Sequence, residues 1–77
     1  MDFTNKALVA GDKRYLVIES VKYDGKTYVF IVNAEDQTDS NFVEAIEKDG
    51  NITTSPIAPE LFKNEILPLF VEKFEAY

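Results

Sequence analysis

YLVIESVKYDGKTYVFIVN, residues 15–33, decides the fold, because two runs rich in Val, Ile, Tyr and Phe flank Asp24 and Gly25. β-Branched and aromatic side chains favour strands. Asp-Gly between such runs favours a two-residue turn with both residues at positive φ, and the twist of that turn suits a β-hairpin. The segment therefore predicts two antiparallel strands that meet at this turn.

A two-residue turn also predicts the register of the hairpin. The expected pairs are Tyr23 with Lys26, Val21 with Tyr28, Glu19 with Phe30 and Val17 with Val32 on one side, and Ser20 with Val29, Ile18 with Ile31 and Leu16 with Asn33 on the other. Both sides are largely apolar. We therefore expect a helix to cover one face and another element to cover part of the second face. A second copy of the chain, in a homodimer, is one candidate for that element.

FVEAIEKDGNITTSP, residues 42–56, repeats the pattern less strongly, with Asp49 and Gly50 between a mixed run and a Thr-rich run. It predicts a second hairpin. Pro56 cannot donate to a strand ladder, so this end is expected at an edge of the sheet. Charged residues and proline at such an edge protect against unwanted strand pairing.

SPIAPELFKNEILPLFVEKFEAY, residues 55–77, predicts a C-terminal helix with Pro59 and Glu60 in its first turn. Apolar residues recur at spacings of three and four, at Phe62, Ile66, Leu69, Phe70, Phe74 and Tyr77. Pro68 removes a hydrogen bond and its ring clashes with the preceding turn, yet the apolar stripe keeps its phase across it. We expect one helix bent near Pro68, with two shorter helices as the alternative.

The predicted fold is α+β: an antiparallel β-meander of three or four strands, built from two Asp-Gly hairpins, with the C-terminal helix packed on one face. A chain of 77 residues fits one domain. We therefore assign residues 1–77 to a single domain, within which residues 1–12 form a short strand, a helical turn or a flexible arm.

The composition excludes several kinds of chemistry. The chain has no cysteine and no histidine, which excludes disulfides, cysteine nucleophiles, Ser-His-Asp triads and most transition-metal sites. No apolar run approaches the roughly 20 residues of a membrane helix, and the N-terminus lacks the charged start and long apolar middle of a signal peptide. These features predict a cytoplasmic protein with no cofactor and no membrane contact.

The net charge of −6 lies entirely in the second half of the chain. Residues 1–32 carry five basic and four acidic side chains, a net +1, whereas residues 33–77 carry three basic and ten acidic ones, a net −7. Direct binding to nucleic acid is disfavoured, because that interaction begins with cations that neutralise phosphates. Three explanations of the acidic excess stay open: a basic protein partner, mimicry of a phosphate chain, or simple solubility.

NAEDQTDSNF, residues 33–42, is the most polar segment and raises the question of a cation site. A twelve-residue calcium loop counted from Asp36 would end at Glu47, but only these ends match the pattern. Hydroxyl side chains take the middle positions, the glycine is missing, and the flanks are predicted strands. We therefore expect no metal site.

An enzyme built on paired carboxylates would need acids that converge on a pocket. Glu19, opposite Phe30 in an apolar row, is the one acid expected to be partly desolvated, and a lysine-paired glutamate is the simpler interpretation. There is no glycine-rich phosphate loop. We expect no catalytic residues and no enzyme, with a carboxylate-dependent enzyme as a distant alternative.

The hypothesis that fits the charge split best is a small protein-interaction module whose acidic half contacts a basic partner. The candidate partner-binding residues are Glu35, Asp36, Asp39, Glu44, Glu47, Asp49, Glu65 and Glu72. An inhibitor that mimics nucleic acid is the alternative, and it requires the helical and loop acids to lie side by side in one row.

The hairpin, the acidic segment after it, the second strand pair and ELFKNEILPLFVEKF together resemble the YrzB-like family of short acidic bacterial proteins. The resemblance covers about residues 15–75. It implies a cytoplasmic bacterial protein without an assigned activity, and it supplies no catalytic residues.

Overall fold

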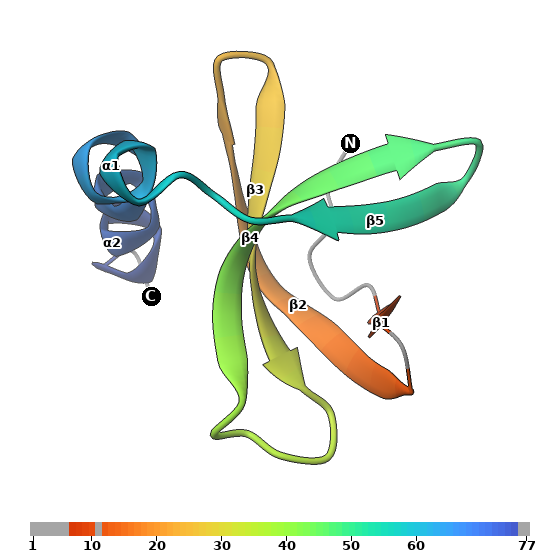
Figure 1. Cartoon of the computed structure of the whole chain (residues 1–77). Coiled ribbons are helices and arrows are strands. Elements are labelled where there is room, and N and C mark those ends of the chain that lie inside the picture. Colours follow the sequence, from red (N-terminus) through yellow and green to blue (C-terminus); the bar gives the residue numbers. More distant parts are fainter. Residues whose placement is uncertain (1–6, 11, 76–77) are drawn as a thin grey trace.

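The computed structural model describes residues 7–10 and 12–75. These residues form β1 (Ala7–Ala10), β2 (Lys13–Tyr23), β3 (Lys26–Asn33), β4 (Ser40–Lys48), β5 (Asn51–Ser55), α1 (Pro59–Leu61), η1 (Phe62–Ile66) and α2 (Leu67–Glu75). The strands form one antiparallel sheet in the order β1-β2-β3-β4-β5 (Figure 1). The predicted α+β meander is confirmed, but it has five strands where three or four were predicted, because residues 7–10 pair with β2.

Both predicted Asp-Gly turns are present. Asp24 and Gly25 have φ values of 52° and 76°, and Asp49 and Gly50 have φ values of 55° and 83°. All four values lie in the left-handed region, which a turn of this type requires at both positions. The second hairpin places β5 at an edge of the sheet, as its Thr-rich sequence and Pro56 predicted.

The predicted β2–β3 register holds from the turn back to Glu19, which pairs with Phe30. Beyond Glu19 the prediction is wrong by one residue, because a β-bulge at Ile18 puts one extra residue into β2. Val17 pairs with Ile31 in place of Val32, and the neighbouring pairs are Leu16 with Val32 and Tyr15 with Asn33. A bulge leaves one residue unpaired and bends its strand.

The bulge decides which side chains of β2 face the interior of the curled sheet. The five strands form a half-barrel, and its inner face holds the buried residues Leu8, Val17, Val29, Ile31, Val43 and Ala45, with Tyr15 and Ile52 packed against them. Figure 1 shows β1 and β5 on the side of the sheet opposite the helix. The second face of the hairpin is therefore covered by strands of the same chain.

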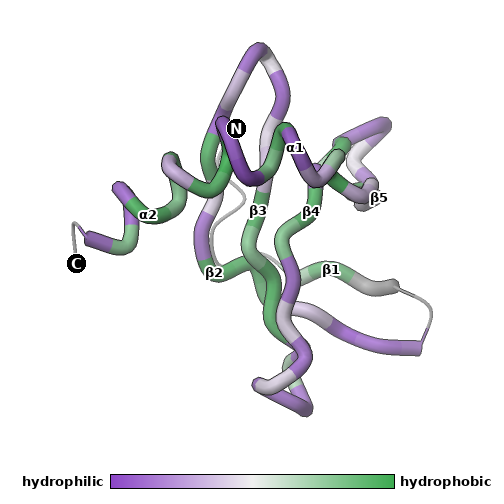
Figure 2. The backbone as a smooth tube through the Cα atoms, turned by 60° about the vertical axis from the view of Figure 1, so that its left-hand side comes forward, coloured by the Kyte–Doolittle hydropathy of each residue, from purple (hydrophilic) through white to green (hydrophobic). Residues whose placement is uncertain are grey.

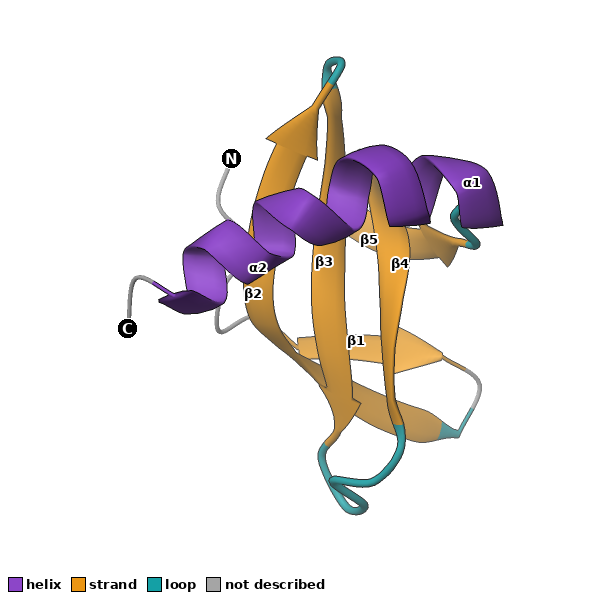
Figure 3. Cartoon of the chain, turned by 90° about the vertical axis from the view of Figure 1, so that its left-hand side faces the viewer, coloured by secondary structure: helices purple, strands orange, loops and turns teal. Residues whose placement is uncertain are grey.

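The C-terminal helix, which comprises α1, η1 and α2, covers the outer face of the sheet. It crosses β4, β3 and β2 near the end that carries the β2–β3 turn (Figure 3). Ile66 and Phe70 are fully buried there, against Val21 and Tyr28 of the hairpin. The predicted stripe is thus confirmed at its centre, whereas Tyr77 lies outside the described residues.

Pro68 is accommodated by a wider turn and does not break the helix. The residues before it, Phe62–Ile66, form a π-helical turn, and the Leu67 N–H donates to the Phe62 carbonyl. Pro68 has no N–H, and its ring crowds the carbonyl four residues earlier, so a locally widened turn relieves the conflict. The helical run therefore continues from Pro59 to Glu75, which excludes two separate helices.

The two ends of the sheet are hydrophilic. Figure 2 shows green, apolar stretches along the central strands, and purple, hydrophilic residues at the β2–β3 turn and in the loop between β3 and β4.

Among the described residues, no helix has both the length and the apolar character to cross a membrane.

Candidate functional site

The acidic loop, residues 34–39 between β3 and β4, is held to the sheet by Asp39. Its carboxylate accepts hydrogen bonds from the Tyr15 hydroxyl (2.9 Å) and the Asn33 side-chain amide (3.2 Å), and Lys13 Nζ lies 3.9 Å away. The Asn33 N–H also donates to the Asp39 carbonyl at 2.8 Å. Asp39 therefore closes the loop and ties it to β2, which leaves its charge only partly available to a partner.

Asp36 supports the same loop from within. It accepts hydrogen bonds from the Thr38 hydroxyl (2.6 Å) and the Thr38 N–H (3.0 Å). The Glu35 N–H donates to the Asn33 side-chain oxygen at 2.9 Å, while the Glu35 side chain is exposed. Hydrogen bonds within the loop therefore hold its shape, and the side chains of Glu35 and Asp36 are exposed.

The hydrogen bonds of the loop change the pKa values of three groups. Donors on Asn33 and Tyr15 hold the pKa of Asp39 below its usual value, and the Thr38 hydroxyl does the same for the pKa of Asp36. The Asp39 carboxylate in turn raises the pKa of the Tyr15 hydroxyl. The charged forms of both aspartates are therefore favoured by folding.

We expect the domain to lose stability in acid through these two aspartates. Their folded-state pKa values lie below the ordinary value of 3.8. The stabilisation is therefore complete above that pH and is lost as the pH falls through the folded-state values. Thermal unfolding followed by circular dichroism between about pH 5 and pH 2 should show Asp39→Asn losing less stability on acidification than the parent.

Glu35→Gln is the matched control, because the Glu35 carboxylate accepts none of these hydrogen bonds. It should follow the acid sensitivity of the parent chain. Parallel pH profiles for Asp39→Asn and the parent would contradict the role assigned to Asp39.

Next to the acidic loop, the outer face of the sheet carries a groove that the C-terminal helix leaves open. This apolar groove has a volume of about 360 Å³ and is lined by Leu16, Ile18, Phe30, Val32, Asn33, Ala34 and Gln37. Leu16 and Ile18 are 43% and 41% exposed, which is high for large apolar side chains on a sheet face. Figure 3 shows the helix crossing β2 and β3 nearer the end that carries the β2–β3 turn, away from the acidic loop.

One flank of α2 continues the apolar surface. Leu67, Val71 and Phe74 follow each other at helical spacing, and all three are exposed. The Phe74 ring packs edge-on against Phe30, a groove residue, with centroids 5.9 Å apart. The groove and this flank of the helix therefore meet at one aromatic contact.

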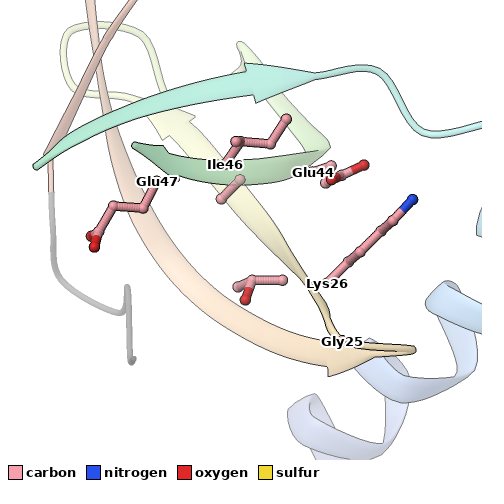
Figure 4. A pocket seen from close by; sticks show the side chains of 7 residues that line it. Gly25, Lys26, Glu44, Ile46 and Glu47 are labelled. Carbon is pink, nitrogen blue, oxygen red and sulfur yellow. The ribbon is translucent and has the colours of Figure 1, made fainter. Parts of the chain in front are cut away.

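The predicted acids of β4 lie away from the acidic loop. Glu44 and Glu47 line a second hollow of about 280 Å³, together with Gly25, Lys26, Thr27, Ala45 and Ile46. In Figure 4 the side chains of Lys26 and Glu44 extend to one side of the ribbon, and that of Glu47 extends to the other. Asp49 lies further along, in the β4–β5 turn.

The helical acids lie in a third place. The charge of Glu65 raises the pKa of Tyr23, which stands beside the β2–β3 turn, so this flank of the helix faces away from the acidic loop. Glu72 is exposed on α2. Figures 1 and 3 both place the helix near one end of the sheet and the acidic loop at the other. The single row of helical and loop acids that nucleic-acid mimicry requires is not formed by the described residues.

Glu19 is the buried acid that the sequence singled out. It is 7% exposed, and its carboxylate lies 3.7 Å from Lys73 Nζ and accepts a hydrogen bond from the Ser20 N–H. Glu19 lines neither of the two hollows described above. The simpler interpretation, a lysine-paired glutamate, is confirmed: it attaches α2 to β2.

Metal binding has no candidate site within residues 7–10 and 12–75. No three acidic side chains in this range converge in a way that could hold an ion. The loop segment counted as a calcium site instead uses Asp36 and Asp39 for its own hydrogen bonds.

The groove residues were absent from the predicted site, although the sequence carries a signal for them. Leu16, Ile18, Phe30 and Val32 belong to the hairpin whose two sides are both apolar. A single helix that crosses the strands, as this one does, cannot cover the whole length of a strand such as β2, with its 11 residues (Figure 3). The predicted site considered charge alone and therefore included only acids.

A comparison of the chain with protein-family models finds no match, and comparisons with curated proteins and with solved structures find none either.

Proposed function

We propose that this domain is a small cytoplasmic protein-interaction module without catalytic activity, and that it binds a basic partner. The observation that carries the proposal is the apolar groove beside an acidic loop whose shape is held by its own hydrogen bonds. Large exposed apolar patches on small domains mark contact sites for other molecules. Here Ala34 and Gln37 line the groove, and Glu35 and Asp36 lie between them in the half of the chain that carries a net −7.

Two further features support this function over the alternatives. Glu19, the acid best suited to catalysis, is paired with Lys73 and lines neither hollow. The predicted acids occupy three separate places, which disfavours mimicry of a phosphate chain. The resemblance to YrzB-like proteins, which have no assigned activity, is consistent with the proposal.

Site-specific photo-crosslinking tests the proposal. A photoreactive residue replaces Gln37, which is exposed and lines the groove, or Asn51, which is exposed on β5 and serves as the control. In a cell lysate, we expect discrete protein adducts from position 37 that disappear when excess unlabelled chain is added. An absence of adducts, or the same adducts from both positions, would overturn the proposal.

A further inference from the structure

We propose that the apolar groove receives a basic amphipathic helix of the partner, which packs beside α2 on the outer face of the sheet. The inference rests on the proposed interaction function and specifies the partner's chemistry. It follows from three properties of the groove: its backbone, its shape and its charge.

Two residues of the groove floor, Leu16 and Val32, have strands paired on both sides and offer no free sheet edge. Leu16 lies in a strand segment paired with β1 on one side and with β3 on the other, and Val32 lies between β2 and β4. An extended peptide binds well where it can join a free sheet edge, because its own N–H and C=O groups then find partners. At Leu16 and Val32 the floor presents only side chains, and Ile18 is a single bulged residue outside the β2–β3 ladder. The floor therefore favours a partner segment whose backbone is already satisfied. A helix meets that condition.

The shape of the groove fits a helix beside α2. Leu16 and Ile18 line the groove and are exposed, and the partly exposed Phe74 of α2 contacts the groove residue Phe30. Helices pack side by side at about 8–10 Å through rows of side chains spaced three and four residues apart. The C-terminal helix already packs on this face by the same spacing, with Ile66 and Phe70 as its buried residues. A second helix would complete the layer.

The charge around the groove favours a cationic occupant over a second copy of the chain. Glu35 and Asp36 are exposed on the acidic loop, between Ala34 and Gln37, which line the groove. Of the nearby cations, Lys13 and Lys73 are paired with Asp39 and Glu19. Arg14, whose carbonyl accepts a hydrogen bond from the Ala34 N–H, offsets one of the two exposed loop charges. Two copies of the chain, each with a net charge of −6, would repel each other across such an interface.

A defined peptide tests the inference. The probe is an amphipathic peptide of leucine and lysine, about 18 residues long so that it can be helical, and its control has the same composition with the leucine stripe scrambled. We expect titration calorimetry to show binding of the striped peptide at least about tenfold tighter than that of the scrambled peptide. Added salt should weaken the binding without abolishing it, because the apolar contact is not screened.

Matched variants locate the contact. Leu16→Ser and Ile18→Ser should each weaken binding of the striped peptide about tenfold. Ile46→Ser should change it less than about twofold, because Ile46 is equally exposed (40%) but lies in the other hollow. Glu35→Lys should weaken binding at low salt, whereas Glu47→Lys, on β4, should not. Thermal unfolding of each variant confirms that it is folded.

The outcomes separate this inference from the proposed function. Equal binding of the two peptides, or equal losses for Ile18→Ser and Ile46→Ser, would overturn the helix inference. Protein adducts at position 37 would still support the interaction function in that case. A dimer of the peptide-free chain that Leu16→Ser dissociates would show that a second copy occupies the groove and would also overturn the inference.

Discussion

Replacing Phe70 by alanine should destabilise the domain by about 3–5 kcal/mol, the usual loss for a buried phenylalanine. Phe70 is fully buried, and its ring lies 4.9 Å from that of Phe42 and 6.1 Å from that of Phe74. The substitution removes the side chain that joins the helix to β4 and leaves a cavity between helix and sheet. Since a small domain has only about 5–15 kcal/mol of stability, the variant should be largely unfolded or close to it at room temperature.

Urea and thermal unfolding followed by far-ultraviolet circular dichroism measure this effect. At about 4 °C or more per kcal/mol for a domain of this size, the melting temperature of Phe70→Ala should fall by about 12 °C or more. Val71→Ala is the matched control, because Val71 is the next residue of the same helix and is 45% exposed. It should change the melting temperature little. Similar losses for both variants would contradict the packing of α2 described above.

Deleting one residue from the middle of β2 should be tolerated at Ile18 and should unfold the domain at Ser20. Removal of Ile18 removes the bulge and leaves the pairs Leu16 with Val32, Val17 with Ile31 and Glu19 with Phe30 unchanged. Each side chain then keeps its face of the sheet. The ladder becomes regular, at the loss of the local bend.

Removal of Ser20 has the opposite consequence. If the strand closes into a regular ladder, Glu19 takes the place opposite Val29, which is fully buried on the inner face. That position separates the carboxylate from Lys73 and buries it without a partner, which costs several kcal/mol. If the bulge persists, residues 13–18 slip by one position and Tyr15 and Val17 turn out of the inner core.

Circular dichroism and amide chemical-shift dispersion distinguish the two deletions. The Ile18 deletion should retain strand signal and a cooperative unfolding transition, whereas the Ser20 deletion should show neither. Unfolding of both chains would mean that the bend of the bulge is itself required. Folding of both would mean that burial does not fix the register of β2.

The groove and the bulge are linked through the same residue. With the extra residue at Ile18, Val17 turns to the inner core while Leu16 and Ile18 stay exposed on the outer face. The site proposed for a partner therefore depends on an irregularity in the strand. This accounts for its absence from a prediction built on regular alternation.

The sequence by itself determined the features that arise from interactions over a few residues. Asp24-Gly25 and Asp49-Gly50 specify their turns because few other pairs adopt positive φ at both positions at low cost. The register next to the first turn, as far as Glu19, follows directly from its two-residue length. The stripe through Ile66 and Phe70 predicted the buried face of the helix because helical periodicity is a local property.

Only the tertiary structure decided the features that depend on contacts between distant segments. No local sequence pattern encodes three such features: the bulge at Ile18, the pairing of residues 7–10 with β2, and the hydrogen bond between Tyr15 and Asp39. The same holds for the groove, which exists because one helix covers only part of a longer sheet face. Local preferences fix turns and periodicity, whereas burial and hydrogen bonding between distant segments fix which faces meet and which surfaces stay open.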